Sequence, residues 1–203
     1  MLQLSKQLEK NQRYIYVLLT GTNTIVAKLI RLYTKEPYSH ASIALDAELK
    51  QLYSFARKQR FNPLNSGFVM EDLEKGVFGA DKKANCGVYE VPVTEEQYEY
   101  ICEEIGRFIN NQDHYKYNYF GLFSAMFGKE IQDDTHFLCS QFVNHVFFNS
   151  GIQLFADEKG LVRPFHFHGR LKDNQIYAGK LCEYRKKYVQ NIASDDGEYA
   201  KAM

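Results

Sequence analysis

Apolar runs along the chain predict a group of β-strands. The run at 14–19 (YIYVLL) is continuously apolar and rich in β-forming residues, which is typical of a buried strand. Further strands are expected at 39–45 (SHASIAL) and 51–55 (QLYSF), and the short DAELK between them predicts a hairpin. A fourth run at 86–93 contains Pro92, which cannot donate to a strand ladder and so indicates a sheet edge or a strand terminus.

Apolar residues at three- and four-residue spacing predict amphipathic helices. One helix is expected at 25–33, after the first strand. Another begins behind Thr94, because Thr94 and Gln97 have the types and spacing of a capping box. Its apolar face carries residues that recur at helical spacing: Tyr98, Ile101, Ile105, Phe108 and Ile109.

The second half of the chain is predicted to hold two more helices. A short apolar helix is expected at 118–127, and another contains the apolar stripe that starts at Phe142, with Gly151 as the left-handed residue behind its end. The stretch 57–84 reads as irregular, with room for one extra strand. Strands mixed with helices, including a hairpin, favour an α+β fold over a doubly wound sheet.

Size and charge narrow the class of protein. The chain has 203 residues, which suits one domain, so we expect a single domain over 1–190 and a flexible polar tail over 191–203. Because 25 basic residues balance 25 acidic ones, we expect no nucleic-acid partner.

No run approaches the ~20 apolar residues of a membrane span. The N-terminus lacks the pattern of a signal peptide, so a cytoplasmic location is expected, while the oligomeric state is not indicated.

One of the four cysteines has a favourable place for chemistry. Cys139 is predicted at the first turn of the helix that contains Phe142. Free backbone N–H groups and the helix dipole at such a position stabilise a thiolate and lower the pKa of a cysteine. The same N–H groups can hold the oxyanion that forms when a thiolate attacks a carbonyl. The other cysteines, predicted in a strand, a helix and a C-terminal segment, lack this advantage: Cys86, Cys102 and Cys182.

A thiol nucleophile needs a base, and His40 is the candidate. His40 shares one face of its predicted strand with two small residues, Ser42 and Ala44, which leaves room for a neighbour. A third polar group usually orients the imidazole. The adjoining hairpin strand offers Ser54 for this task, and Asp46 at the end of the His40 strand is the alternative.

The order of these residues resembles a known family, the permuted NlpC-type, papain-like cysteine hydrolases of the YiiX/YebB-like branch. In papain the cysteine precedes the histidine, whereas here His40 comes early and Cys139 late. The supporting pieces span most of residues 14–165. They are PYSHASIAL, the aromatic block YKYNYFGLF at 115–123, FLCSQFV at 137–143, GIQLF, and Val162-Arg163-Pro164.

The resemblance implies an α+β fold in which the cysteine helix packs on a small antiparallel sheet that carries the histidine. It also implies a cysteine peptidase or amidase without a cofactor, acting on an amide, peptide or ester bond. Relatives often carry a glutamate or another strongly polar residue on the strand after the histidine, roughly where this sequence has Ser54. The aromatic block is expected to line the cleft, and Tyr117 is the candidate for binding substrate through the oxyanion.

Three other functions fit the same residues. A metal site is one, because His136, Cys139 and His145 are near in sequence, and His166 and His168 could add ligands. A non-catalytic binding module on the same fold is another, motivated by the weak third residue. The last is a lipid-directed acyl hydrolase or acyltransferase, for which the basic amphipathic helix at 25–33 is the signal.

Overall fold

The computed structural model describes residues 12–22, 34–58, 65–119, 134–156, 162–184 and 186. Within these residues the fold is α+β, built on one mixed sheet of eight strands. The strands are β1 Arg13–Gly21, β2 His40–Ala44, β3 Leu52–Arg57, β4 Ser66–Glu71, β5 Asn85–Val93, β6 Lys116–Tyr117, β7 His136–Phe137 and β8 Gln175–Lys180. The helices are α3 Gly76–Ala80, α4 Glu95–Asn110, α6 Cys139–Asn149, α7 Pro164–Arg170 and the 3-10 helix η1 Lys172–Asn174.

The sheet is larger than the small antiparallel one that was expected. Its order is β7-β6-β4-β3-β2-β1-β5-β8, and all neighbours are antiparallel except β6 and β7. The predicted β2–β3 hairpin is confirmed. The extra strand allowed for in 57–84 is β4, which pairs with β3 along its whole length.

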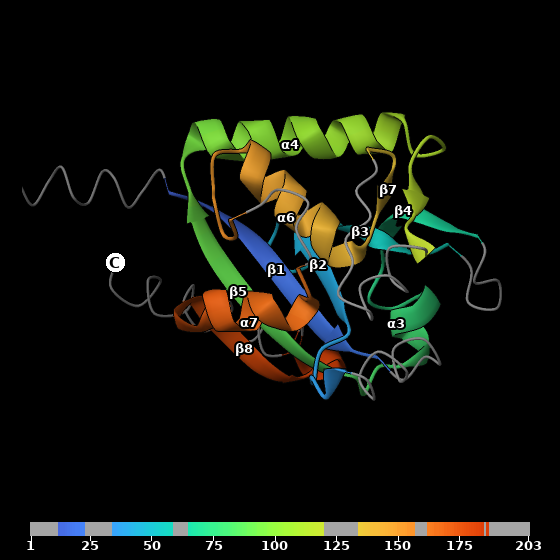
Figure 1. Ribbon diagram of the computed structural model, residues 1–203. Helices are drawn as coiled ribbons and strands as arrows, with labels where there is room; N and C mark the ends of the chain where they lie inside the picture. Colours follow the sequence, from blue (N-terminus) through green and yellow to red (C-terminus); the bar gives the residue numbers. More distant parts are fainter. Residues whose placement is uncertain are drawn as a thin grey trace, which may run out of the picture.

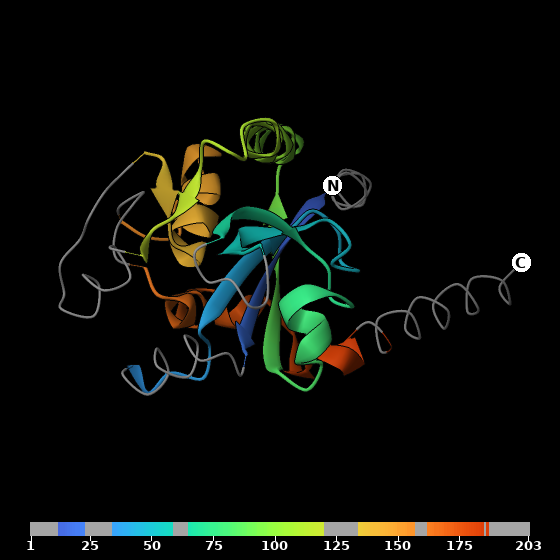
Figure 2. The same cartoon turned by 90° about the vertical axis from the view of Figure 1, so that its right-hand side faces the viewer.

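The sheet is covered on both faces, which explains the continuous apolar run of β1. Ile15, Val17 and Leu19 belong to a core beneath α4, α6 and α7, whereas Tyr16 and Leu18 belong to a second core on the opposite face. Helix α3 lies against that opposite face, below β3 and β4 in both views (Figures 1 and 2). The histidine strand β2 therefore runs through the middle of the sheet, between the two cores.

Pro92 lies beyond the end of the ladder between β5 and β8. Strand β5 lies between β1 and β8, so it is not an edge strand over its whole length. Its pairing with β8 extends only from Asn85 to Tyr89, and Pro92 lies beyond this ladder, opposite Tyr14 of β1. The strand-terminus interpretation is confirmed, because no β8 partner requires an N–H from Pro92.

Helix α4 begins as its sequence predicts. The backbone N–H of Gln97 donates to Oγ1 of Thr94 at 3.2 Å, and the backbone N–H of Thr94 donates to Oε1 of Gln97 at 3.0 Å. Ile101, Ile105 and Phe108 are buried as expected. Ile109 is 43% exposed, so the buried face does not extend to it.

Helix α6 begins at Cys139, as predicted. The N-cap is Leu138, whose carbonyl accepts from the N–H of Phe142 at 3.0 Å and whose own N–H donates to Oε1 of Gln141 at 3.0 Å. Gly151 follows the helix with a φ of +79°, the left-handed conformation that glycine adopts readily. The helix predicted at 25–33, most of that at 118–127 and the tail at 191–203 lie outside the described residues.

Candidate active site

The start of α6 brings Cys139 against β2. The Cys139 residue is only 5% exposed, and its sulfur is hydrogen-bonded to the side chain of His40. Burial alone would raise the pKa of Cys139, but the positive charge and hydrogen bond of His40 lower it below its ordinary value. The backbone N–H groups of Ala41 and Ser140 also donate to the sulfur and act in the same direction. The structure therefore joins the two residues singled out in the sequence, in an environment that favours a thiolate.

A gap in the sheet makes room for this contact. Strand β2 pairs with β1 at all of its residues but with β3 only at Ile43 and Ala44. The first half of β2 is therefore unpaired on its β3 side, and the N–H of Ala41 is used by Cys139 instead of a strand. Helix α6 packs across β2 and β3 at this point.

Glu71 is the third member of the site. Its Oε1 lies 2.9 Å from Nε2 of His40, and its Oε2 accepts a 2.5 Å hydrogen bond from Oγ of Ser42. Burial by itself would lower the pKa of His40, but the negative charges of Glu71 and Cys139, both hydrogen-bonded to it, hold that pKa well above the ordinary value. Because Nε2 faces Glu71, Nδ1 is the ring nitrogen left for the sulfur.

The strand registers explain why Glu71 reaches His40. Glu71 lies opposite Leu52 of β3, and Leu52 lies opposite Ala44 of β2. Since side chains two positions apart share a face, Ala44, Ser42 and His40 lie on the same side of the sheet as Glu71. The glutamate side chain then spans the unpaired half of β2.

Neither residue proposed from the sequence as the orienting group takes that place. Ser54 is fully buried opposite Val69, and its Oγ has no hydrogen-bond partner among the described residues. The Asp46 carboxylate accepts from the backbone N–H groups of Lys50 and Gln51, at 3.0 and 2.6 Å, and so holds the β2–β3 turn. The expectation that Ser54 orients His40 is corrected, because Nε2 of His40 is bonded to Glu71.

Tyr117, the residue expected to bind substrate, lies in the strand β6. It is half-buried in β6, next to β7, which leads into α6. Burial raises the pKa of Tyr117 well above its usual value, and the nearby negative charge of Cys139 raises it further. The phenol therefore stays protonated and keeps a hydrogen that it can donate.

The other cysteines are placed differently. Cys86 is buried in β5, and burial raises its pKa to about 12. Cys102 is half-buried on α4, and its pKa is also raised by burial. Cys182 is exposed in the C-terminal segment. Of Cys86, Cys102 and Cys139, only Cys139 has a lowered pKa.

The histidines of the metal-site alternative have separate partners. Nε2 of His145 lies 3.0 Å from Oε1 of Glu104, and Nδ1 of His168 lies 2.7 Å from the hydroxyl of Tyr89. His166 contacts Arg163, and Nδ1 of His136 contacts Oγ1 of Thr135. In the described part of the chain, no three His, Cys, Asp or Glu side chains converge to hold a metal ion.

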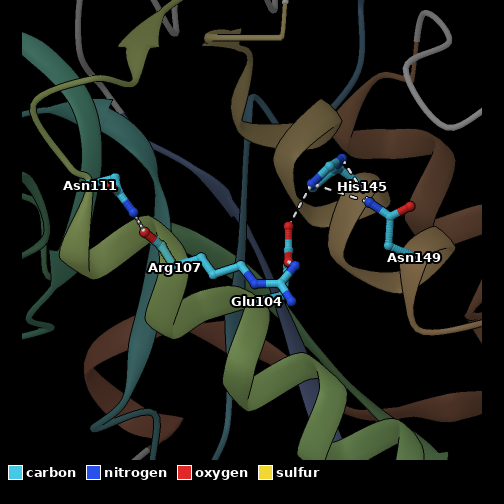
Figure 3. A network of polar contacts seen from close by, with 5 residues as sticks. All are labelled: Glu104, Arg107, Asn111, His145 and Asn149. Atoms are coloured by element: carbon cyan, nitrogen blue, oxygen red, sulfur yellow. Dashed lines mark hydrogen bonds and ion pairs between the residues drawn. The ribbon is translucent and has the colours of Figure 1, made fainter.

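A second histidine–carboxylate pair holds the cysteine helix in place. His145 of α6 meets Glu104 of α4, while Arg107 contacts the other Glu104 oxygen at 2.9 Å and Asn149 contacts the His145 ring (Figure 3). The hydrogen bond from His145 lowers the pKa of Glu104. This pair ties α6 to α4.

A cavity of about 580 Å³ adjoins the site on the Glu71 side. It lies between β3 and β4, the β2–β3 turn and α3. Phe78 of α3 forms part of its wall, with its ring centroid 6.1 Å from that of His40. The stretch 57–84 thus supplies part of the wall of this cavity.

A scan against protein-family models, a search of curated proteins and a search of solved structures each find no match to this chain. Among the described residues, no helix is both long and apolar enough to cross a bilayer.

Proposed function

We propose that the protein is a cysteine hydrolase that cleaves an amide, peptide or ester bond. Cys139 is the nucleophile, His40 the acid–base residue and Glu71 the residue that orients His40. The observation that carries this proposal is that one imidazole is hydrogen-bonded to both a thiol and a carboxylate. The order of His40, then a strongly polar strand residue, then Cys139 is also that of the permuted NlpC-type, papain-like hydrolases.

The first half of the reaction forms a thioester. The Cys139 thiolate attacks the carbonyl carbon of the substrate, and the carbonyl oxygen becomes an oxyanion. Backbone N–H groups at the start of α6 and the hydroxyl of Tyr117 hold that charge. The bond to the leaving nitrogen or oxygen then breaks as protonated His40 transfers its proton to the leaving atom, which departs as an amine or alcohol.

The second half restores the enzyme. Neutral His40 takes a proton from water, and the resulting hydroxide attacks the thioester carbonyl. The carbon–sulfur bond breaks, the acid product leaves, and His40 again carries the proton beside the Cys139 thiolate. Glu71 holds the ring orientation throughout and stabilises the imidazolium form of His40, which donates the proton in the first half and is formed again in the second.

Turnover of an activated ester tests the proposal. We expect the purified protein to hydrolyse a p-nitrophenyl ester and to carry an acyl group on Cys139 when the reaction is quenched early, as seen by peptide mass spectrometry. Cys139→Ala and His40→Ala are expected to abolish turnover. The matched control, Cys182→Ser, removes an exposed cysteine and is expected to leave it unchanged. Turnover that survives Cys139→Ala contradicts the proposal.

The same experiment decides between this proposal and the alternatives on the same fold. A non-catalytic binding module was motivated by the weak third residue Ser54, and Glu71 now occupies that position. Absence of both turnover and an acyl adduct is the result that favours the binding module. The signal for a lipid-directed enzyme, the helix at 25–33, lies outside the described residues.

A further inference from the structure

The cavity beside Glu71 has two kinds of wall. Its apolar side chains come from the β2–β3 turn, the sheet and α3: Leu49, Ala56, Val69, Met70, Leu73, Val77 and Phe78. Four of its lining residues are cations, Lys50, Arg57, Lys58 and Lys75, whereas only Glu71 and Asp72 are acidic. A volume of about 580 Å³ falls in the range of small-molecule sites.

The acidic groups of this cavity are engaged inside the protein. Glu71 is bonded to His40 and Ser42, as described above. Asp72 contacts Nζ of Lys75 at 3.2 Å and accepts from the backbone N–H of Glu74. The lining thus holds four cationic and two acidic side chains, although the whole chain is neutral, and of the cations Lys50 is ion-paired with Glu48 outside the lining.

Lys58 is the cation best placed to meet a ligand. Its side chain is only 28% exposed, and its ion-pair partner among the described residues is Asp113, whose Oδ1 is 3.9 Å from Nζ. Asp113 is 97% exposed, so solvent weakens this pair strongly. A partly buried cation with so weak a partner attracts an anion that enters the cavity.

The cavity adjoins the reacting groups at two points. Glu71 and Phe78, in its wall, are the immediate neighbours of the His40 ring. Arg57, also in the wall, is close enough to Tyr117 for its charge to act on the phenol, and Tyr117 in turn senses the charge of Cys139. A molecule in the cavity is therefore separated from His40 by one side chain, Glu71 or Phe78, and from Cys139 by two, Arg57 and Tyr117.

We infer that this cavity binds the anionic end of the substrate, a carboxylate or phosphate group joined to an apolar body. The apolar body contacts the α3 and β4 side chains, and the anion meets Arg57 and Lys58. This inference rests on the proposed hydrolase function, because it assigns the cavity to the molecule that Cys139 cleaves. It predicts that acidic amphipathic substrates are preferred over neutral analogues of the same length.

A binding experiment on the Cys139→Ala protein tests the charge preference without turnover. The probe is undecanoic acid with a dansyl fluorophore at its far end, and the reference is the matching carboxamide. We expect the acid to bind about tenfold more tightly than the amide. Lys58→Gln and Arg57→Gln should each remove most of this difference in affinity. The control is Lys180→Gln, which removes a cation on β8 that is bonded to Asn85 of β5, and it should leave the difference unchanged. Thermal unfolding checks that each variant is folded. Equal binding of acid and amide overturns the inference.

Protection of the thiol tests whether the bound molecule reaches the active site. In the wild-type protein, saturating dansyl acid is expected to slow alkylation of Cys139 by iodoacetamide at least severalfold, while alkylation of Cys182 is unchanged. A phosphate-ended analogue tested beside the acid identifies which anion is preferred. Preferential binding of the acid without protection of Cys139 overturns the substrate assignment. Failure of the hydrolase proposal is seen separately, as ester turnover that survives Cys139→Ala.

Discussion

Glu71 and His40 lie 31 positions apart in sequence, yet Oε1 of Glu71 is 2.9 Å from Nε2 of His40. Both side chains are largely buried, with 10% and 15% of their surfaces exposed. In such a site a carboxylate strongly favours the protonated imidazole, and the imidazolium favours the thiolate on its other side. The Cys139, His40 and Glu71 side chains therefore form one coupled unit, and the following predictions separate their contributions.

Removing the charge of Glu71 should slow the reaction. Glu71→Gln keeps a similar shape but no longer stabilises the imidazolium, so the pKa of His40 falls and the thiolate is favoured less. We expect ester turnover to drop by about tenfold or more at neutral pH. Asp46→Asn is the matched control, because its carboxylate holds the β2–β3 turn and does not contact His40. Wild-type turnover in Glu71→Gln would show that His40 is oriented by another group.

Ser54→Ala should leave catalysis intact. The Ser54 hydroxyl is buried without a partner among the described residues, so its removal eliminates an unsatisfied polar atom. We expect unchanged turnover and a free energy of unfolding that is equal or higher by about 1 kcal/mol, measured by urea denaturation. A large loss of turnover in a folded Ser54→Ala protein would restore Ser54 as a functional residue.

Tyr117→Phe should weaken stabilisation of the oxyanion without changing stabilisation of the thiolate. The phenol is protonated and near Cys139, so its loss removes a donor to the oxyanion but no charge from the Cys139–His40 pair. We expect turnover to fall by about 10²-fold, while alkylation of Cys139 by iodoacetamide, which forms no oxyanion, keeps its rate. Equal loss in both measurements would instead indicate that Tyr117 supports the position of Cys139.

The His145–Glu104 pair should stabilise the fold in a pH-dependent way. The pKa of Glu104 is lower in the folded protein, so its contribution is complete above the unfolded value of about 4.3 and is lost as pH falls through the folded value. Glu104→Gln should therefore lower the free energy of unfolding by about 2 kcal/mol near pH 6, and the difference should shrink below about pH 4.

A surface carboxylate provides the control for this experiment. Glu95 pairs with Arg13 where both side chains are half-exposed and solvent screens the pair, so Glu95→Gln should leave the free energy of unfolding nearly unchanged. An equal loss of stability in Glu95→Gln and Glu104→Gln would contradict the structural role of the α4–α6 pair.

The sequence predicts those parts of the site that depend on local pattern. The apolar stripe behind Cys139 places it at the start of α6, and alternation in 39–45 gives the face on which His40 lies. Glu71 depends instead on two successive registers, β4 against β3 and β3 against β2, and on the early end of the β2–β3 ladder. The available signal was the segment SGFVME at 66–71, which ends in an acidic residue and can be read as a strand. Apolar and polar residues do not alternate cleanly in this segment, because Val69 and Met70 are adjacent. The pattern therefore does not distinguish the strand from the irregular stretch around it.

The central claim is that His40 and the start of α6 keep Cys139 as a thiolate near neutral pH. The direct measurement is the pH dependence of Cys139 alkylation by iodoacetamide, followed by peptide mass spectrometry from pH 5 to 10, with exposed Cys182 in the same sample for reference. The lowered pKa of Cys139 predicts an alkylation rate whose midpoint lies below the ~8.5 of a free cysteine. In His40→Ala the midpoint should move upward towards that value. A midpoint for Cys139 at or above 8.5 that His40→Ala leaves unchanged would contradict the account.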